Sequence, residues 1–181
     1  MKTNLNYDMF VPTRTLFGAG TLNELHAQPM PGRKALLVIS NGRSTRANSY
    51  LSRTEEQLRM AGVETVLFDR VEANPLKSTV MAGGAMAREN GCDMIVALGG
   101  GSVMDAAKAI AVVASNGGDY WDYIPCGTGK GKAVAETPLP IVAITTTAGT
   151  GSETDAGCVI TNAETHEKTG FCLLYTSDAA D

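Results

Sequence analysis

The stretch that decides the fold is residues 93–114, DMIVALGGGSVMDAAKAIAVVA, where an apolar run leads into three glycines, a serine and an alanine-rich segment. The run from Met94 to Leu98 is typical of a buried strand, and the residues that follow the glycines are strong helix formers. We expect Ser102 to cap this helix, with Asp105 completing a capping box. Glycines let backbone N–H groups approach a ligand closely, and helix N-termini attract anions. The stretch therefore predicts a phosphate-binding turn, the alternative being a tight turn without a ligand.

Two common nucleotide-binding fingerprints do not match this chain. The dinucleotide pattern G-x-G-x-x-G would need glycine at position 104, where this chain has Met104. The Walker A pattern fails there and also at residues 127–131, GTGKG, because the Gly-Lys-Ser/Thr ending is missing. We expect residues 127–131 to form a surface loop. The predicted anion site is therefore neither an ordinary Rossmann turn nor a P-loop.

Apolar runs and helical spacing alternate along the chain. Residues 7–17 are expected to form two short extended pieces, and residues 125–140, rich in glycine, proline and lysine, a mobile loop. The strands are expected at residues 34–40, 63–69, 94–98 and 140–146, and the helices at residues 21–27, 47–61, 79–90 and beyond 102. This βαβ alternation predicts an α/β domain with a parallel sheet covered by helices.

Polar and glycine-rich segments follow four of the predicted strands. They are Ser40–Arg43, the Asn74-Pro75 turn, Gly99–Ser102 and residues 145–153, TTTAGTGSE. Ligands of parallel sheets bind outside the carboxyl ends of the strands, so these segments are expected to meet. The last segment concentrates hydroxyl groups suited to a nucleotide, although threonine-rich turns without a ligand are also common.

Composition excludes several classes of function. The net charge is −4 and the basic residues are scattered, so we expect no nucleic-acid partner. No apolar run approaches the roughly 20 residues of a membrane span, and no signal peptide begins the chain, so we expect a cytoplasmic protein without membrane contact. His26 and His166 stand apart from other ligand types, and the cysteines are too widely spaced for a zinc site or a disulfide framework: Cys92, Cys126, Cys158 and Cys172.

Two motifs together carry a resemblance to a known family. GGGSVMDAAK at residues 99–108 with TTAGTGSE at 146–153 resembles the iron-containing (group III) alcohol dehydrogenases, most closely the NADP-preferring butanol dehydrogenase-like members. The resemblance runs from about residue 5 to about residue 170 and includes the Asn74-Pro75 turn. The first motif is shared with glycerol dehydrogenase, glycerol-1-phosphate dehydrogenase and dehydroquinate synthase. The second motif is not.

The resemblance implies a fold and a set of binding residues. Residues 1–171 would form a dinucleotide-binding domain of modified Rossmann type, dehydroquinate synthase-like, followed in the family by an all-helical domain that holds iron or zinc. Gly100, Gly101 and Ser102 would hold the pyrophosphate, and Asp105 would fix that turn. The ribose and nicotinamide side would be lined by Asn74, Thr146, Thr147, Thr150 and Ser152. Lys168 would lie near the nicotinamide ribose, the alternative being an exposed solvated lysine.

Cofactor choice can be argued from the end of the first long strand. The family position that carries Asp in NAD-specific members falls at Ser40 in this chain, followed by Asn41, Gly42 and Arg43. A carboxylate there would bind a 2′-hydroxyl and repel a 2′-phosphate. Hydroxyl, amide and guanidinium groups suit a phosphate instead, so we predict a preference for NADP(H) over NAD(H).

The implied activity is hydride transfer between NAD(P)(H) and a small primary alcohol or aldehyde, by a metal-dependent enzyme that is a homodimer when full length. The family's metal ligands, one Asp and three His, lie beyond residue 181. We therefore expect no metal site, no catalytic residue and no dehydrogenase activity in this chain alone. The alternatives are a stand-alone nucleotide-binding module and an enzyme of the glycerol dehydrogenase or dehydroquinate synthase kind. Residues 172–181 do not match the family and are expected to be a sequence artefact or a divergent tail.

Overall fold

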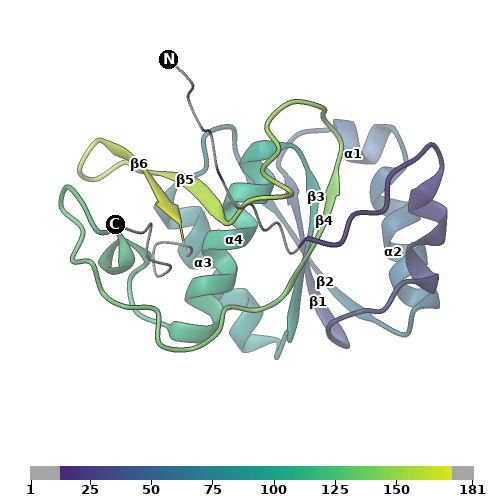
Figure 1. The fold of residues 1–181 in the computed structure, drawn as a ribbon, viewed down its shortest axis with the longest axis horizontal. Coiled ribbons are helices and arrows are strands. Elements are labelled where there is room, and N and C mark those ends of the chain that lie inside the picture. The colour runs from purple at the N-terminus through teal and green to yellow at the C-terminus, as the bar shows by residue number, and fades with distance from the viewer. Residues whose placement is uncertain (1–12, 173–181) are drawn as a thin grey trace, which may run out of the picture.

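Four parallel strands form the central sheet, in the order β2-β1-β3-β4. The computed structural model describes residues 13–172. Flanking helices cover both faces of this sheet (Figure 1), and the predicted α/β class is confirmed. The strands are β1 (Lys34–Ser40), β2 (Glu64–Val71), β3 (Met94–Gly99) and β4 (Ile141–Thr145).

The two central strands are apolar because both of their faces are covered. Every residue of β3 is buried, and so are the five inner residues of β1. Continuous apolar runs of this kind are typical of parallel strands between two helical layers. At the amino-terminal end of these two strands, Asp93 accepts hydrogen bonds from the backbone N–H groups of Arg33 and Lys34 at 2.9 and 2.8 Å. This carboxylate fixes the start of β1 against β3.

The helices form one layer on each face of the sheet (Figure 1). One face is covered by α3 (Lys77–Glu89) and α4 (Gly101–Asn116), whose apolar side chains pack with Leu36, Val38 and Ile95. The other face is covered by the 3-10 helix η1 (Thr21–Ala27), α1 (Ser44–Ala47) and α2 (Tyr50–Met60). Helices α3 and α4 pack so closely at Gly84 that a Cβ there would lie 2.7 Å from Cγ1 of Val113.

A second, antiparallel sheet lies beyond α4. It consists of β5 (Gly157–Asn162) and β6 (Glu167–Cys172), and the 3-10 helix η2 (Tyr120–Tyr123) packs beside it. The ring of Tyr120 meets that of Phe171 edge to face, with centroids 6.2 Å apart. This hairpin was not predicted from the sequence, and it carries one of the predicted site residues, Lys168.

Most of the predicted elements are confirmed within a few residues, and the helix predicted at residues 47–61 corresponds to α2, while the short α1 before it was not predicted. Ser49 has a φ of 57°, a left-handed conformation that interrupts the helical path, so α1 ends at Ala47 and α2 begins at Tyr50. Of the extended pieces expected at 7–17, residues 7–12 lie outside the described part, and residues 13–17 form no strand.

Residues 124–140 form an irregular segment without helix or strand, as expected, and their mobility stays a prediction. The predicted tail at 172–181 lies outside the described residues except for Cys172. Within residues 13–172, no helix combines the length and the apolar character that crossing a membrane requires.

Candidate functional site

The carboxyl ends of the parallel strands bring three predicted segments to one edge of the sheet. Ile39 of β1 pairs with Leu98 of β3, so Ser40 lies beside the start of the glycine turn. The backbone N–H of Thr146 donates to the carbonyl of Gly99 at 2.9 Å, which joins the end of β4 to the same turn. The predicted convergence of these segments is confirmed by the strand register.

The glycine turn opens α4, but not through the predicted cap. The helix begins at Gly101, with Gly100 as the N-cap residue and no capping hydrogen bond from a side chain. Val103 and Met104 donate their N–H groups to the carbonyl of Gly100 at 3.0 and 3.1 Å. The predicted capping box of Ser102 and Asp105 is therefore wrong, because Ser102 already lies inside the helix.

This arrangement leaves donors free at the start of α4. Among the backbone hydrogen bonds of residues 13–172, none has the N–H group of Gly101 or Ser102 as its donor. The first turn of a helix carries unpaired N–H groups and the positive end of its dipole. The start of α4 thus presents two neighbouring backbone donors that suit a phosphate oxygen.

The threonine-rich loop packs directly on the glycine turn. A Cβ at Gly100 would lie 2.9 Å from the hydroxyl of Thr147, and a Cβ at Gly101 would lie 2.9 Å from Cγ2 of Thr150. A side chain at either position would make the facing threonine side chain shift, so glycine allows the closest approach of the two segments. The two motifs, about 45 residues apart in sequence, therefore form adjoining walls.

The side chains of Asp105 and Ser152 contact each other directly. The Ser152 hydroxyl donates to Asp105 Oδ1 at 2.7 Å and accepts from Lys108 Nζ at 2.8 Å. The role predicted for Asp105, fixing the turn of its own helix, is corrected by this geometry. Its carboxylate instead binds the threonine-rich loop and, through the N–H of Val159 at 3.0 Å, strand β5.

The hairpin brings Lys168 to the Asn74-Pro75 turn. Lys168 Nζ donates to Asn74 Oδ1 at 2.7 Å, and the N–H of Thr161 donates to the carbonyl of Pro75 at 2.9 Å. Asn74 adopts a φ of 57°, a left-handed conformation that asparagine tolerates better than most residues. The two predicted residues, 94 positions apart, therefore form one polar pair.

The end of β1 is open and contains no carboxylate. Asn41, Gly42 and Arg43 are exposed, and the N–H of Asn41 donates to the carbonyl of Val71 at 2.8 Å. The neighbouring strand carries Asp69, whose charge is paired with the guanidinium of Arg46 at 2.6 Å.

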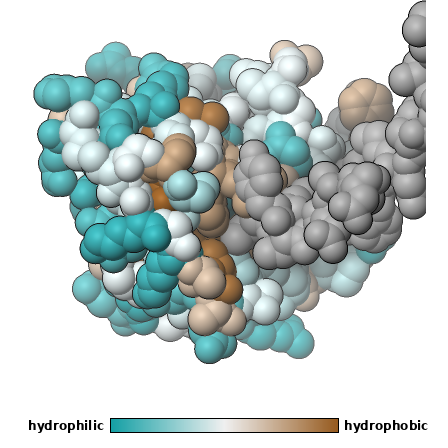
Figure 2. Space-filling model, turned by 60° about the vertical axis from the view of Figure 1, so that its left-hand side comes forward, coloured by the Kyte–Doolittle hydropathy of each residue, from teal (hydrophilic) through white to brown (hydrophobic). Residues whose placement is uncertain are grey.

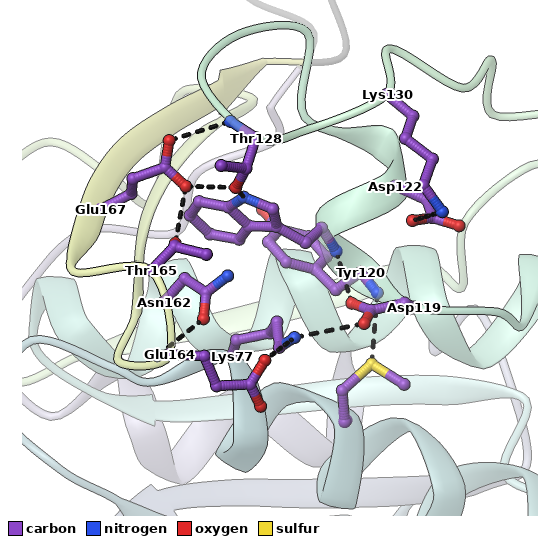
Figure 3. Close-up of polar contacts among 12 residues, drawn as sticks. Lys77, Asp119, Tyr120, Asp122, Thr128, Lys130, Asn162, Glu164, Thr165 and Glu167 are labelled. Carbon is purple, nitrogen blue, oxygen red and sulfur yellow. Dashed lines mark hydrogen bonds and ion pairs between the residues drawn. The ribbon is translucent and has the colours of Figure 1, made fainter.

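A separate polar cluster anchors residues 126–131 to the hairpin (Figure 3). Glu167 accepts hydrogen bonds from the N–H and hydroxyl of Thr128 and from the hydroxyl of Thr165. These hydroxyl donors hold the pKa of Glu167 below its ordinary value. Lys77 joins the hairpin turn to η2, with Nζ at 2.9 Å from Glu164 and 3.2 Å from Asp119.

The four cysteines are free thiols, and the two buried ones, Cys92 and Cys158, are not candidates for a reactive centre. Burial raises the pKa of the Cys158 thiol to about 11, and the Tyr120 hydroxyl, 3.3 Å away, also has a raised pKa because it is buried. Throughout residues 13–172, no three His, Cys, Asp or Glu side chains are grouped so that they could hold a metal ion.

An open cavity of about 370 Å³ lies at the opposite edge of the sheet. It is lined by Met30, Arg33, Ala61 and Asp93 among others, which precede the strands or end α2, and by none of the predicted site residues. Ligands of parallel sheets bind at the carboxyl edge, so this cavity is not the candidate site.

The predicted cofactor-binding residues do not include Lys108, although its spacing from Asp105 could have indicated it. Lys108 follows Asp105 by three positions and so shares its helix face, and its side chain is only 13% exposed. Arg46 carries no such signal, because its partner Asp69 is fixed only by the pairing of β1 with β2.

Comparison with known proteins places these features in context. The family model described as iron-containing alcohol dehydrogenase matches residues 12–177. The chain is 39% identical to 1,3-propanediol dehydrogenase of Klebsiella pneumoniae, covering 90% of this chain and 41% of that protein. It is 38% identical to the probable NADH-dependent butanol dehydrogenase 1 of Bacillus subtilis, covering 92% of this chain and 42% of that protein.

Solved structures agree with these relatives. An archaeal halo-thermophilic alcohol dehydrogenase from a Red Sea brine pool, bound to NZQ, superposes with a TM-score of 0.85 at 38% identity, over 94% of this chain and 44% of that one. NADH-dependent butanol dehydrogenase A of Thermotoga maritima gives 0.83 at 33% identity, over 93% and 42%. The chain thus spans about two fifths of the length of the relatives it matches.

Proposed function

We propose that this chain, which belongs to the iron-containing alcohol dehydrogenase family, binds a nicotinamide dinucleotide at the carboxyl edge of its sheet and serves as the cofactor-binding half of an alcohol dehydrogenase. The complete enzyme would interconvert small primary alcohols and aldehydes, and the bound cofactor would supply or accept the hydride. The observation that carries the proposal is the set of free donors on Gly101 and Ser102 beneath the threonine-rich loop.

The residues present fit such a cofactor. The start of α4 would hold the pyrophosphate, because its donors point out of the helix and no carboxylate accepts from them among the described residues. The hydroxyl groups of Thr146, Thr147 and Thr150 would face the adjoining ribose. The Asn74–Lys168 pair, at 2.7 Å, would bind the nicotinamide side through its remaining donors.

We further propose that the cofactor is NADP(H) in preference to NAD(H). Several relatives carry names that specify NADH or NAD, such as the Bacillus subtilis butanol dehydrogenases. In this chain, however, Ser40 and Asn41 stand at the end of β1, shortly before the exposed Arg43 in sequence, and the carboxylate of Asp69 is paired with Arg46. That environment would accept a 2′-phosphate.

A metal site does not fit the described residues. No group of three or more His, Cys, Asp or Glu side chains in residues 13–172 could hold an ion. The iron or zinc of a complete enzyme would require ligands from elsewhere, and no chemical step is assigned to a metal here. The free cysteines suit the reducing, cytoplasmic setting that we propose for the protein.

A pair of substitutions at one residue tests the proposed site. Gly101 is the first residue of α4, where proline is tolerated, and the preceding Gly100 is extended, as a residue before proline should be. Gly101→Pro removes the proposed donor, whereas Gly101→Ala adds a similar Cβ and keeps it. We expect NADP⁺ to bind Gly101→Pro about tenfold more weakly than Gly101→Ala, as measured by calorimetry, because a charge-assisted hydrogen bond is lost. Equal affinities would contradict the proposal.

A further inference from the structure

Two charged side chains on α4 hold the threonine-rich loop in place. Lys108 Nζ donates three hydrogen bonds, to Ser152 Oγ and Asp155 Oδ1 at 2.8 Å and to the carbonyl of Gly157 at 2.6 Å. An ammonium group has three donors, so its capacity is fully used. Its side chain is 13% exposed, which makes this cation almost inaccessible to an outside ligand.

Asp105 completes the arrangement one turn earlier on the same helix face. Its Oδ1 accepts from the Ser152 hydroxyl at 2.7 Å, and its Oδ2 accepts from the N–H of Val159 at 3.0 Å. Ser152 therefore lies between the two charges, accepting from one and donating its only hydroxyl hydrogen to the other. Because that hydrogen is already donated, the Ser152 hydroxyl has none left for a phosphate oxygen.

The opposite end of the same loop is attached to the glycine turn. The N–H of Thr146 donates to Gly99, and the side chains of Thr147 and Thr150 lie against Gly100 and Gly101. The loop is thus fixed at residue 146 by β3 and at residues 152–159 by α4. The position of Thr147 and Thr150 relative to the free donors of α4 depends on both attachments.

We propose that Lys108, with Asp105 and Ser152, is a positioning group that sets the place of the threonine wall over the glycine turn and so tunes cofactor affinity without touching the cofactor. Its effect on affinity rests on the proposed function, whereas its effect on the loop does not. In this assignment Ser152 links the loop to α4 through its hydrogen bonds with Lys108 and Asp105, and it does not contact the nucleotide.

Hydrogen exchange of the 181-residue chain tests the effect on the loop. Lys108→Met keeps an unbranched side chain and removes the three donors. We expect amide exchange in residues 146–157 to become about tenfold faster, since charge-assisted hydrogen bonds are lost, while exchange in β1 and β3 stays unchanged.

Lys77→Met is the matched control, because Lys77 is 12% exposed and also pairs with two carboxylates, away from this loop. It should leave exchange in residues 146–157 as in the unmodified chain. Unchanged exchange of that segment in Lys108→Met, or equal acceleration in both variants, would overturn the proposal.

A double-substitution cycle tests how Ser152 acts. NADP⁺ affinity is measured for the unmodified chain, Lys108→Met, Ser152→Ala and the combination. We expect Lys108→Met to bind about tenfold more weakly and the combination to bind no more weakly than Lys108→Met alone, because both remove one attachment. Additive losses would mean that Ser152 contacts the cofactor itself, and unchanged affinity in Lys108→Met would reject the positioning role. If the unmodified chain binds neither NADP⁺ nor NAD⁺, the proposed function fails, and the exchange measurement still decides whether Lys108 holds the loop.

Discussion

Single residues at the sheet edge decide what the candidate site can recognise. The backbone of Gly101 and Ser102 offers donors to any phosphate, so it gives affinity without distinguishing two dinucleotides. In the proposed site, discrimination would come from the end of β1, which carries Ser40 and Asn41 and no carboxylate that could bind a ribose 2′-hydroxyl. In the proposed site, affinity and cofactor choice would therefore reside in different elements, the start of α4 and the end of β1, and could be altered separately.

Ser40→Asp tests this division. The introduced carboxylate should repel the 2′-phosphate and accept a hydrogen bond from the 2′-hydroxyl, so we expect the ratio of NADP⁺ to NAD⁺ affinity to fall by about tenfold or more. Calorimetric titration with both nucleotides measures the ratio. Ser52→Asp, the same change at an exposed position on α2, should leave it unaltered. A ratio that does not respond to Ser40→Asp would place cofactor choice elsewhere.

The β5–β6 hairpin connects parts of the domain that are distant in sequence. It carries Lys168 to Asn74, and it anchors residues 126–131 through Glu167 (Figure 3). The sole tryptophan, Trp121, joins this cluster by donating its indole N–H to Thr128 at 2.9 Å. Glu167 thus couples a surface loop to the strand that bears a proposed cofactor-binding residue.

Acidification should release that loop. The pKa of Glu167 is lowered by the hydroxyl groups of Thr128 and Thr165, so the anchored form is favoured above the ordinary pKa of glutamate, about 4.3, and is lost as the pH falls through the lowered value. We expect Trp121 fluorescence to shift to longer wavelength with a midpoint below the ordinary pKa of glutamate, while far-UV circular dichroism stays unchanged.

Glu167→Gln provides the control for this titration. The amide cannot ionise, so the fluorescence step should be absent and the emission at neutral pH should already resemble that of the acidified chain. A step that persists in Glu167→Gln, or one with a midpoint above the ordinary pKa of glutamate, would show that another group controls the loop.

The elements differ in how far they could be predicted from sequence. Strands β1 and β3 were predicted because each apolar run is buried on both faces and needs no alternation to be recognised. The capping box failed because Ser102 and Asp105 have the right spacing, but the glycines let the helix begin earlier and Ser152 competes for the carboxylate. The Asn74–Lys168 contact joins residues 94 positions apart, so local patterns contain no signal for it.

The described residues combine the proposed cofactor site with no group of three or more His, Cys, Asp or Glu side chains that could hold a metal ion. The family match and the relatives identify an alcohol dehydrogenase family, of whose members this chain spans about two fifths. Figure 2 shows a band of apolar residues beside polar surface on one face. Exposed apolar side chains in the described part include Phe17, which is 96% exposed, and Ile141 on the edge strand β4.

The missing ligand set has a measurable consequence. We expect the 181-residue chain to bind the dinucleotide but to show no NADPH-dependent reduction of a small aldehyde, such as butanal, with iron or zinc added, because residues 13–172 offer no group of metal ligands. Absorbance at 340 nm follows the reaction. Turnover above the rate without protein would show that the chain holds a metal in a way that the described residues do not account for.

Amide NMR of the isotope-labelled chain during titration with NADP⁺ maps directly where the nucleotide binds. The proposed site predicts saturable shifts of the Gly101 and Ser102 amides, with further shifts at the end of β1 and in residues 146–152. No saturable shift, or shifts gathered around Met30, Arg33 and Asp93 at the opposite edge of the sheet, would contradict it.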